Sequence, residues 1–176
     1  MSETNNDSID RHPALQDLSR DHHNVLVLCL EIKRSLDDQD HSDEDLDVRS
    51  PQKMAEQLIT FWQTEGNLHF REEEEAFLPV YMRHVSLSDN EDLRQMLHDH
   101  AWLRDRVERL QQLLQADEPF HDLLSETGER LKQHARLEER AVFEHAQDVL
   151  SDDELNEVGR RSRAFRTRNN MNVGAG

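Results

Sequence analysis

Two segments of the sequence carry the same pair of metal-ligating residue types at the same spacing. His69 is followed four residues later by Glu73, and His134 is followed four residues later by Glu138. Residues four apart lie on one face of a helix, with their Cβ atoms about 5–6 Å apart. An imidazole and a carboxylate that share a helix face can bind one cation together. Both His-x-x-x-Glu pairs are therefore candidate metal ligands.

The first pair lies in the stretch HFREEEEAFLP, residues 69–79, which holds four consecutive glutamates. A helix turns by about 100° per residue, so four successive side chains cannot share one face. Glu73 is the glutamate on the face of His69. We expect Glu72 and Glu75 to face water or flank the site, and Glu74 to point outward.

Two further histidines, His22 and His100, interrupt the apolar stripes of other predicted helices. The surrounding sequences LSRDHHNV (residues 18–25) and MLHDHAWL (residues 96–103) match each other in pattern. The chain thus shows a weak internal duplication, in which a lone core histidine is followed by a His-x-x-x-Glu pair, twice over. We also expect a supporting role, across to a neighbouring helix, for the aspartates that precede these histidines, Asp21 and Asp99.

Imidazoles and carboxylates inside a helical core need partners, because burying a polar group without one is costly. A metal ion would satisfy all of them at once. Mixed imidazole and carboxylate ligation suits iron, manganese or zinc, and two glutamates can bridge two ions about 3.5–4 Å apart. The candidate metal ligands are the four histidines in the stripes and the two glutamates: His22, His69, Glu73, His100, His134 and Glu138.

Two other interpretations of the same residues stay open. A single His-x-x-x-Glu pair is usually a surface ion pair, and a single core histidine usually hydrogen-bonds to the backbone or a carboxylate. The six residues could hold one structural ion such as zinc, or form a metal-free polar network inside a helical interaction module. The joint pattern of six residues favours a metal site over the metal-free network, and whether the site holds one ion or two stays open.

Other polar residues are candidates of lower rank. Four further residues are left open as members of the site: His23, His98, His145 and Glu65. Of these, His145 could support a ligand from behind. We expect the remaining histidines at the surface or in loops: His12, His41, His84 and His121. We expect Cys29 to pack in the core.

Apolar residues at alternating spacings of three and four predict the helices that must position these side chains. Four long helices are expected, followed by a shorter fifth one that begins near Ser151. The four long ones cover about residues 13–36, 51–81, 91–115 and 121–150.

Local signals mark several helix ends. Ser50 before Pro51 predicts an N-cap with proline in the first turn. Ser88 to Glu91 and Ser151 to Glu154 each match a capping box, and Pro79 is expected to kink or end its helix. In the fourth helix, the buried stripe is expected to continue past Glu138 to Ala141 and His145.

These elements predict an all-α fold, an up-down-up-down four-helix bundle with a short fifth helix at its C-terminal end. A three-helix arrangement and a helical dimer are the alternatives. We divide the chain into a disordered tail (1–11), the bundle (12–150), and a short helix with a flexible tail (151–176). An acidic loop is expected at 37–50.

The composition excludes several classes of protein. A formal net charge of −17 argues against a nucleic-acid partner, because phosphate binding needs a basic face. No segment approaches the length of a membrane span. With one cysteine, no intramolecular disulfide can form. The polar, acidic start is unlike a signal peptide, so we expect a cytoplasmic protein.

The motifs together resemble the hemerythrin-like family, also called the HHE cation-binding domain. The resemblance covers roughly residues 12–150 and rests on HFREEEEAFLP, HARLEERAVF, LSRDHH and MLHDHAWL. It implies a four-helix bundle that holds a non-haem di-iron centre, with the six candidate ligands named above. Such a pair of irons would carry an oxo or hydroxo bridge, and zinc or manganese are possible in its place.

The sequence departs from the oxygen-carrying hemerythrins at two points. Their third helix carries a His-x-x-x-His pair, whereas here Met96 and Arg104 flank His100, and their last helix has a longer His-to-Asp spacing. Fewer protein ligands would leave positions for water or a small diatomic molecule. The expected function is therefore to sense, store or detoxify oxygen, nitric oxide, peroxide or iron. Open metal positions also permit redox catalysis, but the sequence identifies no substrate pocket, so an enzymatic activity stays open and is the less expected role. The sequence identifies no protein partner.

Overall fold

The computed structural model describes residues 11–37 and 50–171, and all regular secondary structure in these two ranges is helical. Two long segments are helical throughout but change type along their length; we call them rod 2 (51–81) and rod 4 (121–149). The elements are η1 (Pro13–Leu15), α1 (Gln16–Asp37), rod 2 with α2 (Pro51–Phe61), η2 (Trp62–Gly66), α3 (Asn67–Glu72), η3 (Glu73–Phe77) and α4 (Leu78–Tyr81), then α5 (Glu91–Gln115), rod 4 with α6 (His121–Leu137), η4 (Glu138–Val142) and α7 (Phe143–Val149), and finally α8 (Asp152–Arg168).

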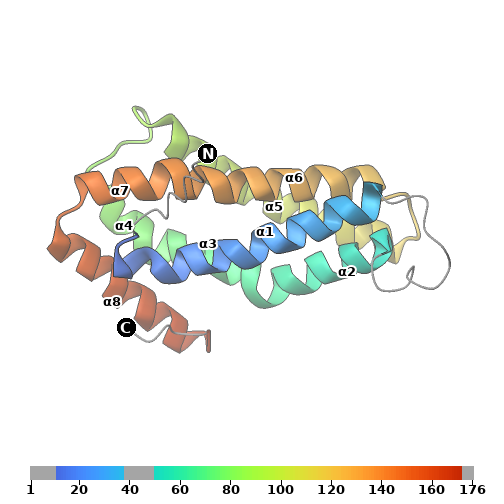
Figure 1. Ribbon diagram of the computed structural model, residues 1–176, viewed down its shortest axis with the longest axis horizontal. Coiled ribbons are helices and arrows are strands. Elements are labelled where there is room, and N and C mark those ends of the chain that lie inside the picture. Colours follow the sequence, from blue (N-terminus) through green and yellow to red (C-terminus); the bar gives the residue numbers. More distant parts are fainter. Residues whose placement is uncertain (1–10, 38–49, 172–176) are drawn as a thin grey trace, which may run out of the picture.

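The four long helical segments pack side by side (Figure 1). Helix α1 contacts α2 and α6, and α5 contacts the same two helices from the other side. Helix α8 lies obliquely across one end of this group, where it packs on η1, α3, η3 and α4. The all-helical prediction is confirmed for the described residues, and α1 and rods 2 and 4 match their predicted ranges closely.

Two of the three predicted helix starts are confirmed. The Ser50 side chain accepts a hydrogen bond from the Lys53 backbone N–H, and Ser151 forms a reciprocal capping box with Glu154. The third prediction is wrong, because α5 is capped by Asn90, whose side chain accepts from the Leu93 N–H. Ser88 pairs with another loop serine instead.

Three π-helical turns, η2, η3 and η4, interrupt the two rods. Each π turn carries one extra residue per turn relative to an α-helix, so it rotates the faces beyond it. After Glu138, the buried positions are Val142, Phe143 and Ala146, whereas the predicted Ala141 and His145 are not buried. The predicted stripe is therefore correct up to Glu138 and one residue out of register after it.

Pro79 does not end rod 2, and the backbone carbonyl that loses its helical partner to this proline is still hydrogen-bonded. The helix continues to Tyr81, and Pro79 follows η3 directly. Proline has no N–H to offer the carbonyl four residues earlier, which is that of Glu75. The Arg161 guanidinium of α8 donates to this carbonyl oxygen at 3.0 Å, so a helix outside the bundle satisfies the acceptor that proline leaves free.

The hydrophobic core consists of two clusters. One contains Val25, Leu103 and Leu131, and the other contains Leu18 and Met96. Along their helices, His22, Glu73, His100 and Glu138 each lie between residues of the two clusters, and His69 and His134 lie one turn before the glutamates. A layer of buried polar side chains thus separates two apolar halves of the core, and such a layer must satisfy its own charges.

Both ends of the described chain are more ordered than the sequence predicts. Helix α8 has 17 residues and extends to Arg168, so most of the segment predicted to hold a short helix and a flexible tail (151–176) is helical. Arg11, placed in the disordered tail, is 7% exposed and hydrogen-bonds to Glu139. Most of the predicted acidic loop lies outside the described residues. No helix among those described has the length and apolar character that crossing a membrane requires.

Candidate metal centre

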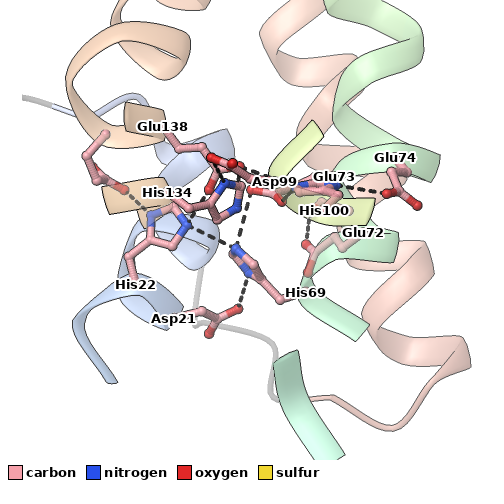
Figure 2. Close-up of polar contacts among 12 residues, drawn as sticks. Asp21, His22, His69, Glu72, Glu73, Glu74, Asp99, His100, His134 and Glu138 are labelled. Carbon is pink, nitrogen blue, oxygen red and sulfur yellow. Dashed lines mark hydrogen bonds and ion pairs between the residues drawn. The ribbon is translucent and has the colours of Figure 1, made fainter. Parts of the chain in front are cut away.

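Six buried side chains from α1, α5 and the two rods meet at mid-height of the helices (Figure 2). Each rod supplies a histidine and a glutamate four residues apart, and α1 and α5 supply one histidine each. None of the six is more than 5% exposed, and both carboxylates are fully buried. The structure brings together all the residues that the sequence analysis proposed as ligands: His22, His69, Glu73, His100, His134 and Glu138.

The six side chains form two overlapping groups of four. His22 and His69 lie with Glu73 and Glu138 in one group, and His100 lies with His134 and the same two glutamates in the other. Within each group, the potential ligand atoms all lie within 4.8 Å of one another. The two carboxylates therefore belong to both halves, as bridging ligands between two cations would.

Each glutamate turns one oxygen to each half. Glu73 Oε1 lies 3.3 Å from His69 Nε2, and Glu73 Oε2 lies 3.3 Å from His100 Nε2. Glu138 Oε2 lies 2.9 Å from His22 Nε2, and Glu138 Oε1 lies 3.0 Å from His134 Nε2. In the first half, the two imidazoles also meet edge to face, with 3.0 Å between His22 Nε2 and His69 Nε2.

Several of these atoms have no hydrogen-bond partner despite the short distances. Both oxygens of Glu73, both oxygens of Glu138 and the Nε2 atoms of His100 and His134 are buried without one. Ligand atoms that all point at one cation come close to each other, but their geometry does not suit hydrogen bonds between them. The nitrogen and carboxylate donors suit iron, manganese or zinc, so the residues present fit a metal centre.

A carboxylate lies behind the outer nitrogen of every histidine in the centre. The Nδ1 atoms of His22 and His100 donate to Glu139 at 2.7 Å and to Glu74 at 2.8 Å. Each of these glutamates directly follows a bridging glutamate in the sequence. A carboxylate in this position fixes the ring orientation and leaves Nε2 free to bind metal.

Asp21 and Asp99 provide the outer carboxylates for the other two histidines. Each of them directly precedes a histidine of the centre in the sequence, whereas the outer glutamates follow a bridging glutamate. Asp21 Oδ2 lies 3.3 Å from His69 Nδ1, and Asp99 Oδ2 lies 3.6 Å from His134 Nδ1. The second distance is too long for a hydrogen bond. Each aspartate thus faces the histidine of a neighbouring rod, as the duplicated sequence pattern predicts, and the internal repeat extends to these outer carboxylates.

An arginine in turn binds each outer carboxylate. Arg104 contacts Glu74 and Arg130 contacts Asp99, and both arginine side chains are about one third exposed, 34% and 31%. The two arginines of the other half are buried, with side-chain exposures of 6% for Arg11, which binds Glu139, and 2% for Arg166, which binds Asp21. The two halves therefore match in their inner residues and differ in their outermost ones.

Burial and the facing carboxylates act in opposite directions on the histidines. Burial alone would lower the pKa of His22, but Glu138 and Glu139 outweigh it and raise this pKa to about 9. The same balance, with Glu138, Glu73 and Glu74, raises the pKa of His100 to about 10. Burial would raise the pKa of Glu138, yet His134, His100 and His22 hold it well below its usual value. The centre therefore favours anionic carboxylates.

Aromatic rings cover much of the centre. Phe70 stacks on the His100 ring at a centroid distance of 4.0 Å, and Phe143 stacks on His22 at 5.6 Å. A cavity of about 410 Å³ reaches His69 from the surface, between α1, η2 and the C-terminal end of α8. Its wall includes apolar residues of the bundle interior and polar side chains such as Asn24. The cavity therefore gives small molecules a route from the surface to His69.

The predictions for the neighbouring glutamates need correction. Glu72 was expected to face water or flank the site; it does not face water, but is fully buried beside the centre and binds Ser162 and Arg166 of α8. Glu74 was expected to point outward, but it hydrogen-bonds to His100. Both departures arise from partners distant in sequence, which helical periodicity does not reveal. Glu139 was also missed as a partner of His22, although its position after Glu138 mirrors that of Glu74 after Glu73.

The residues of lower rank lie outside the two groups of ligands. His23, His98 and Glu65 are exposed, and Glu65 lies in the wall of the cavity. His145 is also exposed, with its Nδ1 2.6 Å from the Tyr81 hydroxyl. Cys29 is buried in the core as predicted. Of the histidines expected at the surface, His84 and His121 are exposed, His12 is half-buried beside the first turn, and His41 lies outside the described residues.

The fold and the site define an all-helical protein with a buried histidine–carboxylate centre of the kind that binds cations. The family model described as the hemerythrin HHE cation binding domain matches residues 14–146. The chain belongs to this family, which confirms the resemblance found in the sequence. Comparisons with curated proteins and with solved structures found no significant match. Helix α8 lies beyond the matched residues.

Proposed function

We propose that the protein holds two non-haem iron ions and uses them to sense or detoxify a small molecule such as oxygen, nitric oxide or peroxide. The observation that carries this proposal is the division of the six ligands into two groups of four that share Glu73 and Glu138. His22 and His69 would hold one ion, and His100 and His134 the other. The two glutamates would bridge them.

Iron bound there would supply redox chemistry and Lewis acidity toward a small ligand. The chain's own residues do the rest. The outer carboxylates orient the imidazoles through Nδ1, and Phe70 and Phe143 exclude water from two of the rings. Each ion would receive four protein ligands, so positions are left for an exogenous molecule. The oxygen carriers have a second histidine four residues from the one on their third helix, but Met96 and Arg104 occupy these positions here. Met96 is buried in an apolar cluster and Arg104 binds Glu74, so neither position supplies a further ligand.

The cavity beside His69 supports the small-molecule role. It places a route from the surface next to one half of the centre. Iron itself as the sensed or stored species is the remaining possibility within the proposal.

The alternatives account for less of the structure. A single structural zinc ion is usually held by four ligands in a closed tetrahedral site, which would leave other buried ligands without a role. In a metal-free interaction module, the core residues should hydrogen-bond among themselves, yet both bridging carboxylates have oxygens without hydrogen-bond partners. Two ions account for all six residues.

We also infer that the four long segments run alternately up and down, and that the protein is cytoplasmic. The contacts of α1 and α5 with the same two rods support the first point. The single cysteine and the acidic composition support the second. The acidic charge likewise keeps nucleic acid an unexpected partner.

Mixing anaerobically prepared ferrous protein with small molecules tests the proposed role. Nitric oxide, oxygen and hydrogen peroxide would each be added while the absorption spectrum is recorded. We expect at least one of them to change the spectrum in proportion to the bound iron. The matched control is the His69→Ala, His134→Ala double variant, which should show no such change. A fully iron-loaded protein whose spectrum none of the three alters would contradict the small-molecule role.

A further inference from the structure

Helix α8 carries a buried charged cluster that the metal ligands do not require. Arg166 is 2% exposed and Glu72 is fully buried, although neither belongs to the six candidate ligands. The Arg166 Nε atom donates to Glu72 at 2.9 Å, and the Ser162 hydroxyl donates to the same carboxylate. Charged side chains are rarely buried this deeply unless they are paired, and removing one partner of such a pair leaves the other charge uncompensated.

The same arginine connects α8 to the metal centre. Arg166 Nη2 donates to Asp21 Oδ2 at 2.6 Å, and this oxygen is the one that faces His69 Nδ1 at 3.3 Å. His69 must present Nε2 to a metal with its proton on Nδ1, so Asp21 fixes the ring in the binding orientation. Arg166 fixes Asp21 in turn.

The corresponding arginine in the other half is different. Arg130 binds Asp99 behind His134, but it lies on α6, within the bundle, and is about one third exposed. Water can replace an exposed guanidinium at little cost. Arg166 is only 2% exposed, and its loss would leave the fully buried Glu72 carboxylate without its cation. Only the His22–His69 half depends on an arginine supplied by α8.

We propose that Arg166 is a positioning residue for His69, so that ion binding in the His22–His69 half is coupled to the docking of α8 on the bundle. The inference rests on the proposed metal centre. Coupling of this kind is reciprocal, so an ion at His69 must also stabilise docked α8. Helix α8 lies beyond the residues that match the family, and its C-terminal end forms part of the wall of the cavity at His69. Release of α8 would therefore open that half of the centre to water.

Metal titration of Arg166→Met and Arg130→Met tests the coupling. Ferrous iron would be added anaerobically, and its binding to each variant would be measured by calorimetry. We expect Arg166→Met to weaken one of the two ions about tenfold, the lower end of the effect seen when residues behind metal ligands are changed. Arg130→Met should bind both ions within about threefold of the wild type. Equal, small effects of the two substitutions would overturn the inference.

Hydrogen exchange of the wild-type chain gives a second readout that does not depend on a variant that folds. Amides of α8 should exchange more slowly in the iron-loaded than in the metal-free protein. The slowing in α8 should exceed that in the last turns of α5, whose amides report the general gain in stability from the ions. A wild type that binds two irons with unchanged exchange in α8 would overturn this inference alone. A wild type that binds no iron would overturn the proposed function, and this inference with it.

Discussion

Each histidine of the centre lies between two carboxylates. On the inner side, Nε2 faces a glutamate shared by both halves, and on the outer side, Nδ1 faces a carboxylate that belongs to one half alone. When a metal binds Nε2, the anion on the outer side keeps the remaining proton of the ring on Nδ1. Glu73 and Glu74 therefore have different roles, although they are adjacent in the sequence: the first faces the metal side of His100 and the second faces its outer side.

Substitution of successive glutamates should separate these roles. Glu73→Gln should abolish binding of both ions, because this carboxylate belongs to both groups of ligands. Glu74→Gln should weaken binding by about 10–100-fold, since it only orients His100. The matched control is Glu75→Gln, which changes an exposed side chain and should leave binding as it is. The measurement is iron bound per chain after equilibrium dialysis, and equal binding by the Glu73 and Glu75 variants would show that the bridging assignment is wrong.

Metal binding should release protons and weaken as the pH falls. The pKa values of about 9 for His22 and about 10 for His100 mean that both rings carry an extra proton near neutral pH when no ion is bound. A metal binds only the deprotonated nitrogen, so it must displace these protons. We expect release of at least about two protons per loaded chain at pH 7.5. Calorimetry in two buffers of different ionisation enthalpy measures this number, and a value near zero would contradict the ligand assignment.

At the scale of elements, helix type matters as much as helix extent. Both rods place their His-x-x-x-Glu pair at the junction where an α-helix gives way to a π turn, η3 or η4. The pair keeps its spacing of four, while the extra residue of the π turn rotates the following turns toward the core. This accounts for the register error after Glu138, because periodicity alone does not reveal where a π turn lies.

Two substitutions at the start of α5 test which residue caps this helix, Asn90 or Ser88. Asn90→Ala should destabilise the protein by about 1 kcal/mol, because it removes the acceptor for the Leu93 N–H. Ser88→Ala should change stability little, although the sequence suggested that this serine was the cap. Urea unfolding of both variants measures the difference. A larger loss from Ser88→Ala would mean that the helix begins earlier than described.

At the scale of the whole molecule, the centre divides the apolar core and concentrates buried charge between its two parts. In the absence of metal, protonated histidines and carboxylates must compensate one another there, which is a weak source of stability. Bound ions would replace this balance with direct ligation from all the long helical segments. Metal should therefore contribute to the stability of the entire fold.

Removal of metal should lower the melting temperature measurably. A ligand present at 100 times its Kd stabilises the folded state by about 2.7 kcal/mol, and in a chain of this size 1 kcal/mol corresponds to about 2–4 °C. We expect the chelated protein to melt about 5–10 °C below the loaded protein in differential scanning calorimetry. The Glu73→Gln variant should show no difference between the two conditions, whereas an equal shift in that variant would mean that the metal binds elsewhere.

Much of the fold and the whole set of inner residues could be predicted from the sequence. Helical spacing identifies which glutamate shares a face with His69, and repetition of the pattern around His22 and His100 distinguishes a site from chance. The burial of Glu72 could not be predicted, because its partners are more than 85 residues away in the chain. The order of α8 and of Arg11 depends on the same kind of long-range contact, which no local pattern encodes.

The most direct test of the account is the number of ions that one chain holds. Protein reconstituted anaerobically with ferrous iron would be analysed by native mass spectrometry, which counts bound metals on the folded chain. The two groups of four ligands that share Glu73 and Glu138 predict a dominant species with two irons. A dominant species with one ion, or with none, would contradict the dinuclear centre on which the proposed function rests.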